Sequence, residues 1–357
     1  MSNVNIETIM PLPSPNDILL EIPISKNTSD FVQKTRQDIL KILRGEDKRL
    51  LFIVGPCSIH DVDQALVYAK ELKHISDMVK DRILVVMRTY FLKPRTTVGW
   101  KGLIHDPKLN ETYDVIMGIK LARKLLNEIN KLELPCGYEM LDTITPQYIA
   151  DLMSWGAIGA RTTESQIHRE LVSGVSMPVG FKNGTGGTIK IAVDAMVSAS
   201  YPHCFPGITM DGKPAICKTS GNSGTHLILR GGARGSNYSP PFITTAELLI
   251  KSTNKSEPKH LVNEAIMVDC SHGNSNKNHE NQEIVLGSIL AQKMAGNSSI
   301  KGVMIESNIR EGKQPFNVTN NVAPTLKYGI SITDSCISLD KTRILLMDAY
   351  VKLKDVV

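Results

Sequence analysis

The chain has 357 residues, of which 41% are hydrophobic and 22% charged, with a formal net charge of +5. This length suits one large α/β barrel or two average domains, and no apolar run approaches the roughly 20 residues that span a bilayer, which excludes a membrane partner. Basic and acidic residues alternate without long blocks, so nucleic acid is not an expected partner. The N-terminus lacks a secretion signal, so we expect a cytoplasmic protein with reduced cysteines.

The N-terminal region divides into an irregular arm and a helix. Residues 1–27 contain four prolines and little periodicity, which predicts an extended arm. A helix is predicted to begin at Ser29, which can cap it, and to end at Gly45, which suits a C-terminal stop. Its inner stripe consists of Phe31, Val32, Thr35, Ile39, Ile42 and Leu43. We therefore expect residues 1–45 to precede a catalytic barrel at 46–357.

Short β-type runs alternate with segments of helical period along the rest of the chain. The runs lie at 50–54, 83–87, 136–141, 157–160, 178–181, 226–229, 265–268 and 302–305. Eight β-then-α units in a chain of this length predict an α/β fold, a closed (β/α)8 TIM barrel rather than an open sheet. Residues 208–219 alternate around Asp211-Gly212, which predicts a β-hairpin inserted outside the barrel.

An ionisable or metal-capable side chain follows every predicted strand. Because the chemistry of a barrel takes place at the C-terminal ends of its strands, this pattern indicates an active site. In chain order the side chains are Cys57, Arg88, Glu139, Arg161, Lys182, Arg230, His272 and Glu306. Several of them are cationic, and Lys93 and Arg95 add to these, which indicates substrates that carry several negative charges.

Four residues that are far apart in the sequence offer donors for a metal ion. They supply a thiolate, an imidazole and two carboxylates, a mixed set suited to one divalent transition metal such as Mn, Co, Fe or Zn. The four residues are Cys57, His272, Glu306 and Asp334. Barrel closure would bring the strands before the first three side by side. A buried cysteine without a ligand role is the alternative for Cys57 taken alone.

Long motifs in a fixed order carry a resemblance to a known enzyme family. The chain resembles the bacterial and fungal, feedback-regulated type I 3-deoxy-D-arabino-heptulosonate 7-phosphate (DAHP) synthases in the motifs GPCSIHD, MRTYFLKPRTTVGWKGLIHDP, PVGFKNGT, ILRGG, VDCSHGNSNK, MIESNI and YGISITDSC. The resemblance implies that the chain condenses phosphoenolpyruvate with D-erythrose 4-phosphate and water and releases phosphate. This reaction is the first step of the shikimate pathway of aromatic amino acid biosynthesis.

The resemblance also implies a role for each reactive residue. The metal ligands would be Cys57, His272, Glu306 and Asp334. The ligands of phosphoenolpyruvate would be Arg161 and Arg230 for its phosphate and Arg88 and Lys182 for its carboxylate. The ligands of erythrose 4-phosphate would be Lys93, Pro94, Arg95 and Thr96. Two candidates remain for the group that activates the attacking water: Glu139 acting with Lys182, or His272. The expected catalytic residues are therefore Lys182, Glu139, His272 and Cys57.

The N-terminal arm and the hairpin imply feedback regulation. In the family such elements build an inhibitor pocket for an aromatic amino acid at the subunit contacts of a homotetramer. The matching positions are Asn3, Pro146, Gln147, Gly174, Val175, Ser176, Phe205, Gly207 and Cys217. Tyrosine-sensing members resemble this chain in carrying glycine at position 207, where phenylalanine-sensing members carry serine. Because a para-hydroxyl needs space and a hydrogen-bond partner, we expect tyrosine as the inhibitor; a strand-entry role for Gly207 is the alternative.

Three rival functions are weaker. An octulosonate-8-phosphate synthase would join phosphoenolpyruvate to a pentose phosphate, but KPRTT, the arm and the hairpin favour the four-carbon aldose. A catalytically inactive sugar-phosphate-binding paralogue would lack one of the reactive residues, and none is missing. A basic nucleic-acid binder does not fit the mixed charge pattern.

Overall fold

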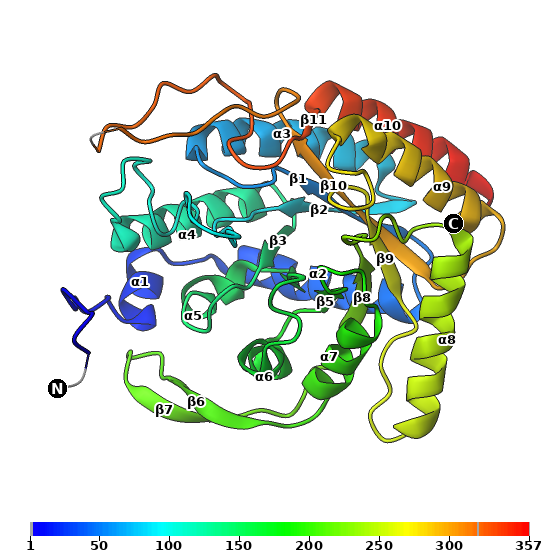
Figure 1. Ribbon diagram of the computed structural model, residues 1–357, viewed down its shortest axis with the longest axis horizontal. Helices are drawn as coiled ribbons and strands as arrows, with labels where there is room; N and C mark the ends of the chain where they lie inside the picture. The colour runs from blue at the N-terminus through cyan, green and yellow to red at the C-terminus, as the bar shows by residue number, and fades with distance from the viewer. Residues whose placement is uncertain (1–2, 320, 357) are drawn as a thin grey trace.

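The computed structural model describes residues 3–319 and 321–356 and shows a closed barrel of parallel strands (Figure 1). The strands follow one another in the order β1-β2-β3-β4-β5-β8-β9-β10, and β10 pairs with β1 to close the barrel. Their bounds are β1 Leu50–Gly55, β2 Ile83–Arg88, β3 Cys136–Glu139, β4 Trp155–Ile158, β5 Val179–Lys182, β8 Thr225–Leu229, β9 Ile266–Asp269 and β10 Ile300–Asn308. The predicted TIM barrel is confirmed, and every predicted strand has a counterpart.

Helices connect the strands and cover the outside of the barrel (Figure 1). They are α3 Val62–Val79, α4 Val115–Lys131, α5 Pro146–Ile149, α6 Gln166–Gly174, α7 Lys190–Ser200, α8 Pro240–Ser256, α9 Gln282–Met294 and α10 Leu339–Lys352. Short 3-10 turns and one short strand complete the barrel region: η1 Ala150–Leu152, η2 His279–Asn281, η3 Leu353–Asp355 and β11 Ile337–Ser338. None of the helices in the described part of the chain has the length and apolar character to span a bilayer.

The interior of the barrel is a separate apolar core that one helix closes at the N-terminal end of the strands. Successive residues of a strand point to opposite faces, so alternate residues such as Leu51 and Ile53 point inward. The helix α2 (Lys26–Arg44) adds Ile39, Ile42 and Leu43 to the same buried cluster. The interior of the barrel is therefore filled by side chains, and the C-terminal ends of the strands stay open for chemistry.

The N-terminal region is more ordered than predicted. A helix, α1 (Pro15–Glu21), lies where an extended arm was expected, and its N-cap Ser14 forms a capping box with Asp17. The next helix begins at Lys26 rather than near Ser29, because Ser25 accepts a hydrogen bond from the backbone of Thr28 at 3.1 Å. The expected C-terminal stop is confirmed, since Gly45 adopts a left-handed φ of 79°.

The inserted hairpin is longer at its start than the predicted range 208–219. It consists of β6 (Cys204–Ile208) and β7 (Pro214–Lys218), which pair antiparallel, with Gly212 in the turn at a φ of 76°. Pro206 and Gly207 are poor strand formers and concealed the first strand. In Figure 1 the hairpin extends from α7 toward α1, where the backbone N–H of Asn16 donates to the Met210 carbonyl at 2.9 Å.

Candidate active site

A cavity of about 500 Å³ opens at the C-terminal ends of the barrel strands. The predicted site residues that line it are Lys93, Pro94, Arg95, Thr96, Glu139, Arg161, Lys182, Arg230, His272 and Asp334. Three other predicted residues, Cys57, Arg88 and Glu306, are fully buried next to this group. The cavity therefore gathers side chains from loops that are far apart in the sequence, as the rule for barrels predicts.

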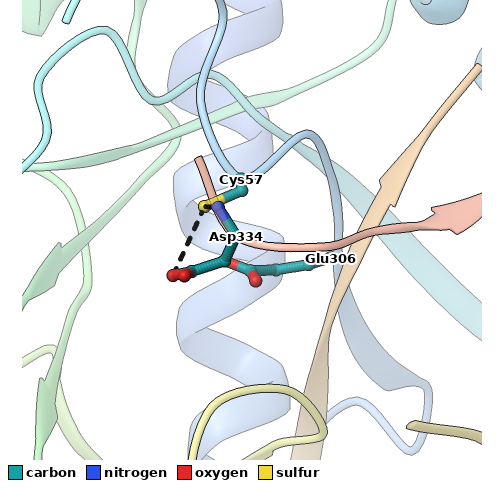
Figure 2. Close-up of side chains that lie close together, drawn as sticks. All are labelled: Cys57, Glu306 and Asp334. Carbon is teal, nitrogen blue, oxygen red and sulfur yellow. Dashed lines mark hydrogen bonds between the residues drawn. The ribbon is translucent and has the colours of Figure 1, made fainter. Parts of the chain in front are cut away.

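The candidate metal ligands meet on one side of this site. Figure 2 shows Cys57, Glu306 and Asp334 pointing toward one another, and one donor atom from each lies within 4.8 Å of the other two. The Cys57 Sγ lies 3.8 Å from Asp334 Oδ2 and accepts a hydrogen bond from the Asp334 backbone N–H at 3.4 Å. His272 Nε2 lies 3.7 Å from Glu306 Oε1. The structure thus brings three of the four predicted ligands together, and it places His272 beside Glu306 but outside this cluster.

Burial and neighbouring charges give the ligands different protonation states. Burial raises the pKa of the Cys57 thiol to about 11, and the nearby Glu306 carboxylate adds to this. Burial also opposes ionisation of Glu306, but His272, Arg88 and Lys93 outweigh it and lower the pKa of this carboxyl to about 2. Glu306 is therefore an anion at neutral pH, whereas Cys57 must lose a proton before it can act as a ligand.

Arg88 occupies a different place from the other cations. Its side chain is buried rather than part of the cavity wall, and its Nη2 donates to Glu306 Oε1 at 3.0 Å. The guanidinium also lies 3.9 Å from the centre of the Tyr90 ring. Arg88 therefore fixes and neutralises the Glu306 carboxylate directly.

Asp269 joins two predicted site residues and is itself not among the residues predicted from the sequence. Asp269 is the last residue of β9 and is fully buried. Its Oδ2 lies 3.2 Å from Lys182 Nζ and 2.9 Å from His272 Nδ1. Burial opposes its ionisation, but His272 and Lys182 hold the pKa of Asp269 well below its usual range. Its position at a strand end, in VDCSHGN, was the available signal.

Hydrogen bonds join two loops across the cavity. These loops carry most of the predicted ligands of erythrose 4-phosphate and of the phosphate of phosphoenolpyruvate. Arg161, after β4, donates from Nη2 to Thr96 Oγ1 at 3.0 Å. Lys93 donates from Nζ to the Cys57 carbonyl at 3.1 Å, which connects the same loop to the metal ligands. Burial disfavours the charged amine, but Cys57 and Glu306 together raise the pKa of Lys93, so it stays cationic.

The predicted inhibitor positions lie on elements that contact one another outside the barrel. Pro146 begins α5, whose Tyr148 donates to the Pro13 carbonyl at 2.7 Å and so joins α5 to the arm. Gly174 ends α6, and the neighbouring Ser173 hydroxyl lies 2.7 Å from Thr219 Oγ1 at the base of the hairpin. Asn3 lies in the exposed arm. The arm, α5, α6 and the hairpin thus form one group of elements.

Gly207 of the hairpin has less free space above it than expected. A Cβ atom at this position would lie 2.5 Å from Cys217 Sγ. Phe205 is paired with Cys217, and Gly207 with Ala215, so these residues belong to one short stretch of the hairpin. Any side chain at position 207 must therefore displace the Cys217 thiol.

Comparisons with known proteins agree with this architecture. A family model described as the DAHP synthetase I family matches residues 21–347. The chain is 48% identical over 328 residues to the tyrosine-inhibited phospho-2-dehydro-3-deoxyheptonate aldolase of Schizosaccharomyces pombe, covering 92% of this chain and 86% of that protein. It is 46% identical over 353 residues to the Tyr-sensitive enzyme of Escherichia coli K12, covering 99% and 96%.

A solved structure supports the same relationship. The phospho-2-dehydro-3-deoxyheptonate aldolase of Francisella tularensis SCHU S4 superposes with a TM-score of 0.92 at 44% identity and covers 98% of this chain and 99% of its own. The match extends over the barrel, the arm region and the hairpin together. The chain therefore belongs to the DAHP synthetase I family, and its enzyme class is that of the DAHP synthases.

Proposed function

We propose that the chain condenses phosphoenolpyruvate with D-erythrose 4-phosphate and water, yields DAHP and phosphate, and depends on one divalent metal ion. The observation that carries the proposal is the cavity at the strand ends, whose wall combines six cationic side chains with a cluster of metal-type donors on one side. Two phosphorylated substrates repel each other, so a cationic wall is what their joint binding requires.

The cationic residues divide between the two substrates. Arg161 and Arg230 hold the phosphate of phosphoenolpyruvate, and Lys182 holds its carboxylate. Arg88, which donates a hydrogen bond to Glu306, approaches the same carboxylate from the buried side. Lys93, Pro94, Arg95 and Thr96 hold erythrose 4-phosphate. The Arg161–Thr96 hydrogen bond supports this division, because it sets the two phosphate sites next to each other.

The donor set fits a divalent transition metal, because a thiol and two carboxylates cluster and an imidazole lies beside one of the carboxylates. Cys57, His272, Glu306 and Asp334 would hold it. A divalent ion there supplies Lewis acidity toward the aldehyde oxygen of the sugar. Mn, Co, Fe and Zn all suit such ligands.

The residues around phosphoenolpyruvate have two tasks, orientation and proton transfer. Lys182 is held by Asp269, and the pair fixes the ammonium group against the substrate carboxylate. Water that adds to the substrate must lose a proton to a nearby base. Glu139 with Lys182 is one candidate, since both line the cavity, and His272, whose Nδ1 faces Asp269, is the other.

An assay of phosphate release with each aldose tests the reaction. We expect turnover of phosphoenolpyruvate with erythrose 4-phosphate and little with a pentose phosphate. Arg95→Met should raise KM for the four-carbon sugar, whereas Arg230→Met should raise KM for phosphoenolpyruvate. Preference for the pentose phosphate would favour the octulosonate reaction, and no turnover with either sugar would favour a binding paralogue.

We infer that tyrosine is the feedback inhibitor. Two relatives are named tyrosine-inhibited or Tyr-sensitive, and this chain has Gly207 where a side chain would collide with Cys217. The inhibitor pocket would comprise the arm, α5, the end of α6 and the hairpin. Titration with tyrosine, phenylalanine and tryptophan tests the inference on the wild type and Gly207→Ser. Stronger inhibition of the wild type by phenylalanine would contradict it.

Assembly and location complete the proposal. A homotetramer is the expected assembly, because arm and hairpin expose apolar side chains such as Ile9 and Ile216 that a second copy would cover. Light scattering of the purified protein measures its mass. The cytoplasm is the expected compartment, and cell fractionation tests it.

A further inference from the structure

One cationic residue of the cavity has no role in the reaction as described above. Lys277 lines the cavity together with Arg230, Gly232, Ala233 and His272. Within residues 3–319 and 321–356, no carboxylate and no hydrogen-bond acceptor is paired with its ammonium group. By contrast, Lys182 is paired with Asp269 and Lys93 with the Cys57 carbonyl. Lys277 therefore presents an uncompensated positive charge at the cavity wall.

The backbone holds Lys277 in an unfavourable conformation. Asn276 and Lys277 have φ values of 53° and 59°, in the left-handed region that residues with a Cβ rarely adopt. The Lys277 N–H donates to the His272 carbonyl at 2.8 Å and closes the loop after β9. Strained backbone of this kind persists where the surroundings fix it, and it is common at ligand sites.

The loop of Lys277 is joined to the loop of Arg230. The Gly273 N–H donates to the Arg230 carbonyl at 3.0 Å, and Asn274 Nδ2 donates to the Leu229 carbonyl at 3.1 Å. The two loops also pack closely, since a Cβ on Gly231 would lie 2.5 Å from the Gly273 carbonyl carbon. Lys277 and Arg230 are thus carried by neighbouring strand ends that are rigidly connected.

From this geometry we propose that Lys277 is a further phosphate-binding residue, which acts with Arg230 on the phosphate that phosphoenolpyruvate brings and the reaction releases. The proposal rests on the proposed function for the identity of that substrate. An ammonium group is a point charge that binds a phosphate oxygen without demanding a fixed direction. Lys277 therefore complements the guanidinium of Arg230.

The test compares Lys277→Met with Lys277→Arg and with Lys259→Met, an exposed lysine outside the cavity. Methionine keeps a Cβ and a long apolar chain, so the backbone strain stays while the charge is lost. We expect Lys277→Met to raise KM for phosphoenolpyruvate and the Kd of inorganic phosphate by about three- to tenfold, as suits a solvent-exposed charged contact. KM for erythrose 4-phosphate, Tm and the Lys259→Met control should stay near wild type, whereas Lys277→Arg, which keeps the charge, should restore part of the phosphate affinity that Lys277→Met loses.

Calorimetric titration with inorganic phosphate separates this proposal from the reaction itself. If the wild type fails to turn over phosphoenolpyruvate, the proposed function fails, while weaker phosphate binding by Lys277→Met still supports Lys277 as a phosphate ligand. Unchanged phosphate affinity in Lys277→Met would overturn the proposal. A rise in KM confined to erythrose 4-phosphate would also overturn it, because it would assign Lys277 to the other substrate.

Discussion

At the scale of single residues, Asp269 controls two groups that the reaction needs. Its carboxylate is fully buried, and it lies close enough to pair with Lys182 and to orient His272. A partner that orients a ligand or a substrate-binding group typically matters nearly as much as the group itself.

Asp269→Asn should therefore lower turnover by about 10- to 100-fold. The amide keeps the size of the side chain but removes the charge that pairs with Lys182. Steady-state kinetics and metal content measure the effect on substrate and metal sites separately. Asp194→Asn, on the exposed face of α7, is the matched control. Wild-type turnover in Asp269→Asn would show that the contact is merely structural.

Cys57 is the residue whose ligand role is most easily confused with packing, since it is buried like Cys136. We expect Cys57→Ala to lose bound metal and most turnover, while Cys136→Ala keeps both. Each substitution removes one buried sulfur atom, so both variants should lose a similar, small part of their stability, about 1 kcal/mol. Metal analysis and thermal unfolding of the two variants decide the matter. Equal metal content in both would support a packing role for Cys57.

At the scale of elements, periodicity predicted the barrel strands because their buried runs are continuous. The predicted and observed ends of an element differ where the surroundings of a single residue decide where the element begins. The strand β4 begins at Trp155, two residues before the predicted start, because the indole fills the barrel interior. The helix α2 begins where Ser25, rather than Ser29, finds a backbone donor. The partners of Asp269 and Arg88 depend on barrel closure, which no local pattern encodes.

The corner between α9 and β10 predicts a dependence of stability on pH. Burial, together with the charges of Lys301 and Lys48, lowers the pKa of Lys293 from 10.5 to about 8. Between these values the unfolded chain binds more protons than the folded one, so stability rises with pH through this window. Below about pH 8 the amine is charged in both the folded and the unfolded chain, so the full cost of holding this charge in a half-buried site lowers the stability.

Lys293→Met should remove this contribution. The free energy of unfolding of the variant minus that of the wild type should therefore be larger at pH 7 than at pH 10. The variant also loses the hydrogen bond from Lys293 to the Ile300 carbonyl at 3.1 Å. Urea unfolding at both pH values measures the difference. The exposed Lys251→Met variant should follow the wild type at both. Parallel profiles for Lys293→Met and wild type would argue that this amine titrates normally.

At the scale of the whole molecule, the N-terminal region serves two different purposes. Residues from Ser14 onward are part of the folded body, since Ile18 is buried and Arg123 Nε donates to the Ile22 carbonyl at 2.9 Å. The segment before Ser14 exposes Val4, Ile6, Ile9 and Met10 by 72, 51, 77 and 82%. Apolar surface costs about 25 cal/mol per Å² in water, so burial against another copy would stabilise an assembly.

Deletion of residues 2–12 should therefore weaken assembly and tyrosine inhibition but leave turnover close to wild type. The cut ends before Pro13, whose carbonyl accepts from Tyr148, and before the Ser14 cap of α1, so the barrel keeps its contacts. Light scattering should show a mass below four times that of the truncated chain, which is itself lighter than the 39.3 kDa full-length chain.

A full-length variant with serine at positions 4, 6, 9 and 10 separates apolar burial from the presence of the chain. If burial drives assembly, this variant should dissociate like the deletion, because it keeps the backbone and loses only the apolar side chains. Should it stay assembled while the deletion dissociates, backbone contacts of the arm would carry the interface. An unchanged mass and an unchanged tyrosine titration in both variants would exclude the arm from assembly and from regulation.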